Sequence, residues 1–128
     1  MGKANIFFKD GKWHILGQMG AEIARFGNDG LKLGGGEAIL KMGRLSGTLA
    51  GIAAIGSAAV AVGTVTGMTG LVTGDRVFVT KKTAFAGNVG FVGAIVPSTN
   101  TLNIWVANTK PDSAGSIPSC GVDVVYLR

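Results

Sequence analysis

Residues 101–107 read T-L-N-I-W-V-A, with Leu, Ile and Val at every second position. This period of two matches a β-strand, in which successive side chains point to opposite faces, and differs from the 3.6-residue period of a helix. Turn-forming clusters flank the stretch, P-S-T-N at 97–100 and N-T-K-P-D at 108–112. We therefore predict a strand over 101–107, bounded by turns.

Further strands are predicted on both sides of this one. Stretches rich in β-branched and aromatic residues, which favour strands, occur at 76–80, 88–96 and 122–127. Short strands separated by turn residues are typical of a β-sandwich or a jelly-roll-like barrel. The sequence predicts an all-β protein whose C-terminal part is a compact β-sandwich or jelly-roll-like domain.

The amino-terminal part has the pattern of β-hairpins. Residues 6–16 read I-F-F-K-D-G-K-W-H-I-L, in which Asp10-Gly11 favours a type I′ turn, and 28–30 (N-D-G) marks a second turn. Isolated hairpins are marginal in water, so they need something to pack against. The triple glycine at 34–36 predicts a joint. We expect a hairpin arm over 1–36, which serves for docking, and a β-sandwich domain over 37–128.

The run over 45–74 carries no charged residue. Its length is sufficient for a transmembrane helix, but seven Gly and five Thr interrupt it, and residues 59–66 alternate as a strand does. A buried or intersubunit strand is the preferred interpretation, with a membrane segment as the alternative. The pattern leaves open whether the first part, up to residue 57, is strand, helix or extended arm.

Composition favours a scaffold over an enzyme. The 128 residues are 47% hydrophobic and 15% charged, which excludes intrinsic disorder, and the 22 glycines follow no collagen period. The apolar residues are mostly small, so the core of one chain is thin and contacts between subunits are expected to supplement it. The single cysteine, Cys120, excludes an intramolecular disulfide.

Residues for catalysis or for a cofactor are scarce. The chain has one histidine, His14, and one cysteine, so a His/Cys metal site is not expected, and a His14–Cys120 nucleophile pair is disfavoured. No nucleotide-binding motif is present. Lys81-Lys82 is the densest basic spot, and lysines at a strand end commonly keep the edge soluble. We predict no enzymatic activity, no cofactor, no metal, no small-molecule substrate and no nucleic-acid partner.

The order of segments in the second half resembles a small β module of tailed-bacteriophage virion proteins. The segments are V-G-T-V-T-G at 62–67, G-D-R-V-F-V at 74–79, N-V-G-F-V-G-A-I-V at 88–96, N-T-L-N-I-W-V-A-N-T at 100–109 and V-V-Y-L-R at 124–128. The preceding G-L-K-L-G-G-G-E-A-I-L-K-M, at 30–42, looks like the joint by which such modules follow an arm. The resemblance covers about residues 30–128 and implies a non-enzymatic structural protein of the virion, expected to be a homotrimer.

A capsid decoration (cement) protein is the leading hypothesis, bound to the major capsid protein on the outside of the head. Candidate docking residues are the amino-terminal aromatics Phe7, Phe8, Trp13 and Phe26, and candidate subunit-interface residues are Val60, Val62 and Val65. The alternatives are a tail-fibre or spike component, a small phage membrane protein that uses the uncharged run 45–74, and a DNA-binding protein. Since no secretory signal is evident, we expect synthesis in the host cytoplasm.

Overall fold

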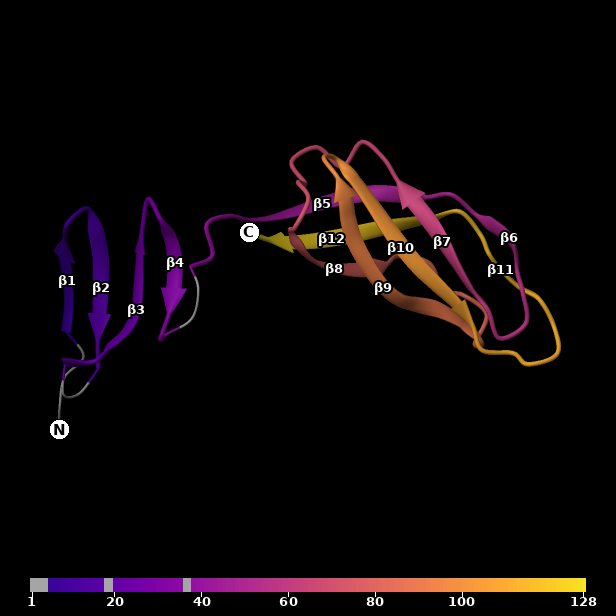
Figure 1. Ribbon diagram of the computed structural model, residues 1–128, viewed down its shortest axis with the longest axis horizontal. Coiled ribbons are helices and arrows are strands. Elements are labelled where there is room, and N and C mark those ends of the chain that lie inside the picture. The colour runs from indigo at the N-terminus through magenta and orange to yellow at the C-terminus, as the bar shows by residue number, and fades with distance from the viewer. Residues whose placement is uncertain (1–4, 18–19, 36–37) are drawn as a thin grey trace. The chain divides into compact units, whose positions relative to one another are not determined.

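The computed structural model describes residues 5–17, 20–35 and 38–128 and consists of β-strands joined by turns and loops (Figure 1). None of these residues lies in an α-helix, so the expected all-β class is confirmed. The chain divides into two compact units: unit 1 comprises Met1–Met42 and Leu127–Arg128, and unit 2 comprises Gly43–Tyr126.

Unit 1 contains one antiparallel sheet in which the strands follow each other in chain order. Its four strands are β1 (Asn5–Lys9), β2 (Lys12–Leu16), β3 (Glu22–Gly27) and β4 (Gly30–Leu33). At the β1–β2 turn, φ is 51° at Asp10 and 76° at Gly11. Positive φ at both positions is what a type I′ turn requires, and the predicted hairpin is confirmed. The second predicted hairpin joins β3 to β4.

The boundary between the units lies after Met42, beyond the triple glycine at which the sequence placed it. Two backbone interactions explain the later position. Leu31 and Ile39 form an antiparallel bridge, and the backbone amide of Leu40 donates to the carbonyl oxygen of Arg128. Residues 38–41 therefore extend the contacts of unit 1.

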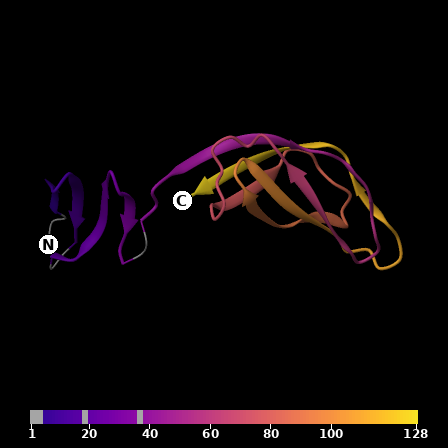
Figure 2. The ribbon, with the colours of Figure 1, turned by 45° about the horizontal axis from the view of Figure 1, so that its top comes forward.

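Unit 2 is built from eight strands. They are β5 (Met42–Leu49), β6 (Ile52–Ile55), β7 (Val60–Val65), β8 (Arg76–Lys81), β9 (Val89–Ser98), β10 (Thr101–Asn108), β11 (Gly115–Ile117) and β12 (Cys120–Leu127), of which β5 begins and β12 ends at the boundary with unit 1. Two sheets have three strands each, in the orders β5-β12-β8 and β7-β10-β9, and β6 pairs with β11. The central position of β10 between β7 and β9 can be followed in two views (Figures 1 and 2).

All three sheets of unit 2 contribute to a single hydrophobic core. Leu102, Ile104 and Val106 of β10 are fully buried, as are Val122 and Val124 of β12. The alternation that predicted β10 thus separates its buried face from its outer face. A buried side chain of this size contributes about 1.5–3 kcal/mol through removal of apolar surface from water.

The segment whose conformation the sequence left open forms strands β5 and β6. Glycines in this uncharged region allow close packing inside the core. A Cβ added at Gly47 would lie 2.6 Å from Sδ of Met68, and one added at Gly63 would overlap the side chain of Leu49. The small residues, expected to bring neighbouring copies together, thus serve the core of one chain at these two positions. Within the described ranges, no helix has the length and hydropathy to cross a bilayer.

Asn108 fixes the loops at one end of unit 2. It is 2% exposed, and its Nδ2 lies 2.9–3.2 Å from the carbonyl oxygens of Ile55, Gly56 and Ser113. Its Oδ1 accepts hydrogen bonds from Nδ2 of Asn88 and from the backbone amide of Lys110. A buried amide with these partners satisfies its own hydrogen-bonding groups and connects the end of β6 to the loop before β11.

Candidate functional site

The amino-terminal sheet has one apolar face, built from two rows of side chains that run across all four strands. The registers pair the strands as Phe8–Trp13–Phe26–Leu31 and as Ile6–Ile15–Ala24–Leu33. Paired residues point to the same face of a sheet, so the two rows form one surface without a charged residue. The two-residue turn at Asp10-Gly11 sets the register that brings Phe8 opposite Trp13, with ring centroids 5.3 Å apart.

This apolar face is exposed. Phe8 is 60% exposed, and Trp13 and Phe26 are each 44% exposed. The six most exposed side chains of the face together present on the order of 600 Å² of apolar surface, at the upper end of what a monomeric protein shows. No described residue of unit 1 falls in the buried class. The sheet therefore has a hydrophobic face but no core.

The opposite face of the same sheet is polar, and Phe7 lies on it. Its register row contains His14, Arg25 and Lys32. The ring of Phe7 stacks on that of His14 at 5.1 Å, and Nδ1 of His14 lies 2.7 Å from a carboxylate oxygen of Glu22. Of the four predicted docking aromatics, the fold brings together Phe8, Trp13 and Phe26, and it places Phe7 on the other face.

At the β3–β4 turn, Nζ of Lys12 lies 2.7 Å from the carboxylate of Asp29, and the guanidinium of Arg25 is 3.6 Å away. The hydrogen bond from Lys12 holds the pKa of Asp29 below its usual value. Exposed ion pairs of this kind contribute little to stability. The polar face is therefore compatible with water, in contrast to the apolar face.

The predicted interface residues lie on β7, where they divide between two faces. Val60 is 56% exposed and Val62 is 50% exposed, whereas Val65 is only 2% exposed. Val65 belongs to the hydrophobic core of unit 2 and offers no surface to a neighbour. The outer face of β7 therefore retains Val60 and Val62 as surface residues.

The outer face of the β5-β12-β8 sheet carries an ionic cluster around Asp123. Its carboxylate accepts hydrogen bonds from Oγ of Ser46 and Nη2 of Arg44, and Nζ of Lys82 lies 3.1 Å away. These donors, with Ser46 contributing most, hold the pKa of Asp123 well below its usual range. The cluster joins segments distant in sequence, which is a structural role, and sequence reasoning missed it because its members are scattered.

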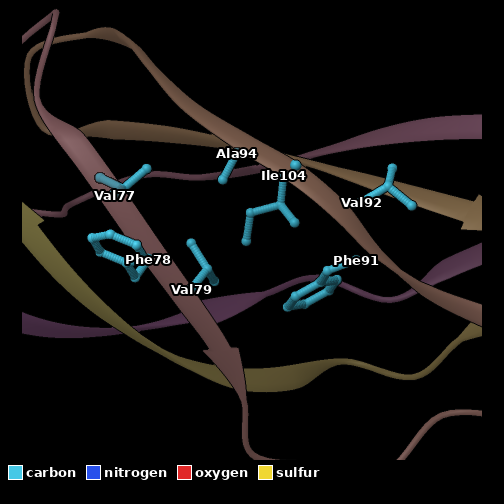
Figure 3. A pocket seen from close by; sticks show the side chains of 8 residues that line it. Val77, Phe78, Val79, Phe91, Val92, Ala94 and Ile104 are labelled. Carbon is cyan, nitrogen blue, oxygen red and sulfur yellow. The ribbon is translucent and has the colours of Figure 1, made fainter.

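An open apolar groove of about 260 Å³ lies between β8 and β9 of unit 2 (Figure 3). Each of these strands is at the edge of its sheet. The groove is lined by Val77, Phe78, Val79, Phe91, Val92, Gly93, Ala94 and Ile104. None of these side chains can donate a proton, accept one or bind a metal, so the groove suits apolar contact and not acid–base chemistry.

The residues considered for catalysis lie in different units. His14 is on β2 and bonds to Glu22, whereas Cys120 begins β12 and is 2% exposed. Burial raises the pKa of the Cys120 thiol, which lowers the fraction of the nucleophilic thiolate. Over residues 5–17, 20–35 and 38–128, no three His, Cys, Asp or Glu side chains are grouped to hold a metal ion.

The surface with the most exposed apolar side chains is therefore the apolar face of the amino-terminal sheet. Sequence reasoning identified its aromatic residues but missed the aliphatic members of the two rows, which are Ile6, Ile15, Ala24, Leu31 and Leu33. The register set by the two turns is the signal that identifies them. Comparison of the chain with protein-family models, curated proteins and solved structures found no match.

Proposed function

We propose that this protein is a capsid decoration protein of a tailed bacteriophage, which binds the outer surface of the head and stabilises it. The observation that carries the proposal is the apolar face of unit 1, with the row Phe8–Trp13–Phe26–Leu31 at its centre. A four-stranded sheet with no buried residue gains its missing apolar contacts when it docks on another surface. The resemblance of residues 30–128 to phage virion modules supports a capsid as that surface.

The proposed docking residues are Phe8, Trp13 and Phe26. Aromatic side chains in a desolvated centre dominate the energetics of protein interfaces, and this row is free of charges that docking would strip of water. Unit 2 is proposed to be the jelly-roll-like body that stays outside the shell. It has its own core and therefore does not depend on the capsid to fold.

Homotrimeric assembly is part of this proposal. A capsid presents many copies of each site, so a trimer that engages three sites binds more tightly than one chain does. The gain depends on the geometry, because all three amino-terminal sheets must reach their sites at once. Closed assembly also lets each copy brace neighbouring capsid subunits.

The test is immunogold electron microscopy of intact virions with an antibody against this protein. Label distributed over the head supports decoration. Label confined to the tail overturns it in favour of a fibre or spike component, and absence of label from the particle overturns both. A matched pair of variants then assigns the surface: Trp13→Ala is expected to abolish head labelling, whereas Phe7→Ala, on the opposite face, is expected to retain it.

A further inference from the structure

Unit 1 contains the dipeptide Asp-Gly twice, each time at a hairpin. Asp10-Gly11 lies between β1 and β2, and Asp29-Gly30 lies where β3 turns into β4. This dipeptide cyclises without an enzyme more readily than others, because a glycine has no side chain to hinder the attack of its amide nitrogen on the preceding carboxyl group. The structure places the two copies in different surroundings, so we do not expect them to react alike.

The first turn leaves its dipeptide open to water. Lys9 pairs with Lys12, so Asp10 and Gly11 are the two central residues of the turn and lie outside the ladder between the strands. Both are exposed, and a Cβ added at Gly11 would have open space around it within 4 Å. The preceding strand, β1, is at the edge of the sheet, and all five of its residues are exposed. Local opening of this turn therefore costs little free energy.

The second turn restrains both reacting groups. Gly27 pairs with Gly30, so Gly30 closes the turn, and the amide of a closing residue donates to the carbonyl oxygen on the other side of the turn. A Cβ added at Gly30 would overlap the backbone of Ile39, so this glycine is closely packed. The carboxylate of Asp29 lies 2.7 Å from Nζ of Lys12. The nucleophile and the carboxyl group are thus both held by other partners.

From this contrast we infer that Asp10 is a site of spontaneous isomerisation to isoaspartate, and that the fold protects Asp29 from the same reaction. In the first step, the amide nitrogen of Gly11 bonds to Cγ of Asp10. The hydroxyl group of the neutral carboxyl leaves with the amide proton as water. A five-membered succinimide ring remains, in which the nitrogen is bonded to both carbonyl carbons.

The second step returns the water. Addition of water at Cγ breaks the new bond to nitrogen and restores aspartate. Addition at the main-chain carbonyl carbon breaks the original peptide bond and gives isoaspartate, in which the main chain runs through the side chain of residue 10. The two steps together consume no oxidant, reductant or cofactor.

The ion pair at Asp29 slows the first step. A neutral carboxyl group releases water, whereas a carboxylate has no comparable leaving group. The hydrogen bond from Lys12 holds the pKa of Asp29 below its usual value, so a smaller fraction of this side chain is neutral at a given pH. Because the pair is partly exposed, added salt weakens this protection.

Isomerisation of Asp10 changes the turn that sets the register of β1. Isoaspartate adds one carbon atom to the main chain, so a two-residue turn no longer has the type I′ geometry. We expect Phe8 to lose its position opposite Trp13 in the modified chain. The reaction goes beyond the proposed function and does not depend on it.

The test is incubation of the full chain for several weeks at neutral pH in water labelled with heavy oxygen. The chain is then digested in ordinary water and analysed by mass spectrometry. Hydrolysis of a succinimide leaves one labelled oxygen in the residue, and fragment ions distinguish isoaspartate from aspartate. We expect labelled isoaspartate to form at least about fivefold faster at Asp10 than at Asp29, the factor that opening one hydrogen bond costs.

The same incubation in concentrated guanidinium chloride shows whether the fold causes the difference. We expect the two rates to converge there, because the turns and the ion pair are lost. Absence of labelled product at Asp10, equal rates in the folded chain, or an undiminished difference in denaturant would each overturn the inference. Since no capsid is present, these outcomes are independent of head labelling.

A matched pair of variants tests the protection of Asp29. Lys12→Met removes its ion pair and is expected to raise labelling at Asp29 without lowering it at Asp10. Lys32→Met is the control, because Lys32 lies on the same polar face, and it is expected to leave both rates unchanged. Circular dichroism confirms that both variants are folded. Equal labelling of Asp29 in the wild type and in Lys12→Met would overturn the protection assigned to the ion pair.

Discussion

Unit 1 and unit 2 use the same kind of structure but bury their apolar side chains differently. In unit 2, three sheets enclose a core that includes Leu102, Ile104 and Val122, all fully buried. In unit 1, a single sheet exposes a complete apolar face, and none of its described residues is buried. Hydrogen-bonded strands alone therefore do not indicate a stable domain. The comparison indicates that unit 2 has the apolar packing that stabilises a fold, and the exposed face of unit 1 supports the proposal that this sheet docks on a partner.

The largest expected effect is that of removing a buried side chain from unit 2. Ile104→Ala leaves a cavity in the centre of β10 and is expected to lower the free energy of unfolding by about 2–5 kcal/mol. The same substitution in unit 1, Ile6→Ala, acts on a side chain that is 64% exposed and is expected to cost less than about 1 kcal/mol. Urea denaturation of both variants measures the difference. Equal destabilisation would contradict the division of roles between the units.

The buried amide of Asn108 gives the next effect on stability. Asn108→Asp keeps the shape of the side chain but removes the donors to the carbonyls of Ile55, Gly56 and Ser113. We expect a loss of about 2–3 kcal/mol, because the carbonyl groups lose their partners and a carboxylate is buried beside them. Asn103→Ala, on the outer face of the same strand, is the control and should cost less than about 1 kcal/mol. If the two variants melt at the same temperature, Asn108 does not hold the loops.

For unit 1, we expect a substitution to lower the affinity of the chain for capsids and not its stability. Trp13→Ala removes the centre of the aromatic row and is expected to weaken capsid binding at least about 30-fold, as truncation of an interface hot spot does. Its effect on the thermal midpoint of the free chain should be small, since Trp13 is 44% exposed. Co-sedimentation with capsids measures the affinity. Phe7→Ala is the control on the polar face, and an equal loss of binding in both variants would disprove the one-sided docking surface.

The smallest expected effect is on the thermal stability of the fold at low pH. The pKa of Asp123 is lower in the folded chain than in the unfolded chain, so its ion network stabilises the fold above about pH 4. This contribution is lost as the pH falls below that value. The thermal midpoint of the wild type should therefore drop more steeply below pH 4 than that of Asp123→Asn. Asp112→Asn, in an exposed loop, should follow the wild type, and parallel curves for all three proteins would show that the network does not contribute.

The sequence predicted the all-β character, both amino-terminal hairpins and the main strands, because these depend on local signals. Asp10-Gly11 determines a turn, and the alternation at 101–107 determines a strand and its buried face. The conformation of residues 45–57 was left open because Gly and Ala have weak preferences. Only the packing of Gly47 against Met68 shows why glycine occurs at that position.

The candidate surfaces were predicted in part. Aromatic content identified Phe8, Trp13 and Phe26. The two-residue period of a strand places the adjacent Phe7 and Phe8 on opposite faces, whereas the strand register is needed to align Phe8 with Trp13 and Phe26. Val65 was grouped with Val60 and Val62, although it is three positions from Val62 and so faces the core.

Hydrogen exchange measured by mass spectrometry, on the full chain free and bound to capsids, tests the central claim most directly. In the free protein we expect slow exchange for β10 and β12 and fast exchange for β1–β4, which have no core beneath them. On capsids, β1–β4 are expected to become protected, while unit 2 changes little outside its own subunit contacts. If β1–β4 exchange as slowly as β10 in the free protein, or gain no protection on the capsid, the amino-terminal sheet is not the docking surface.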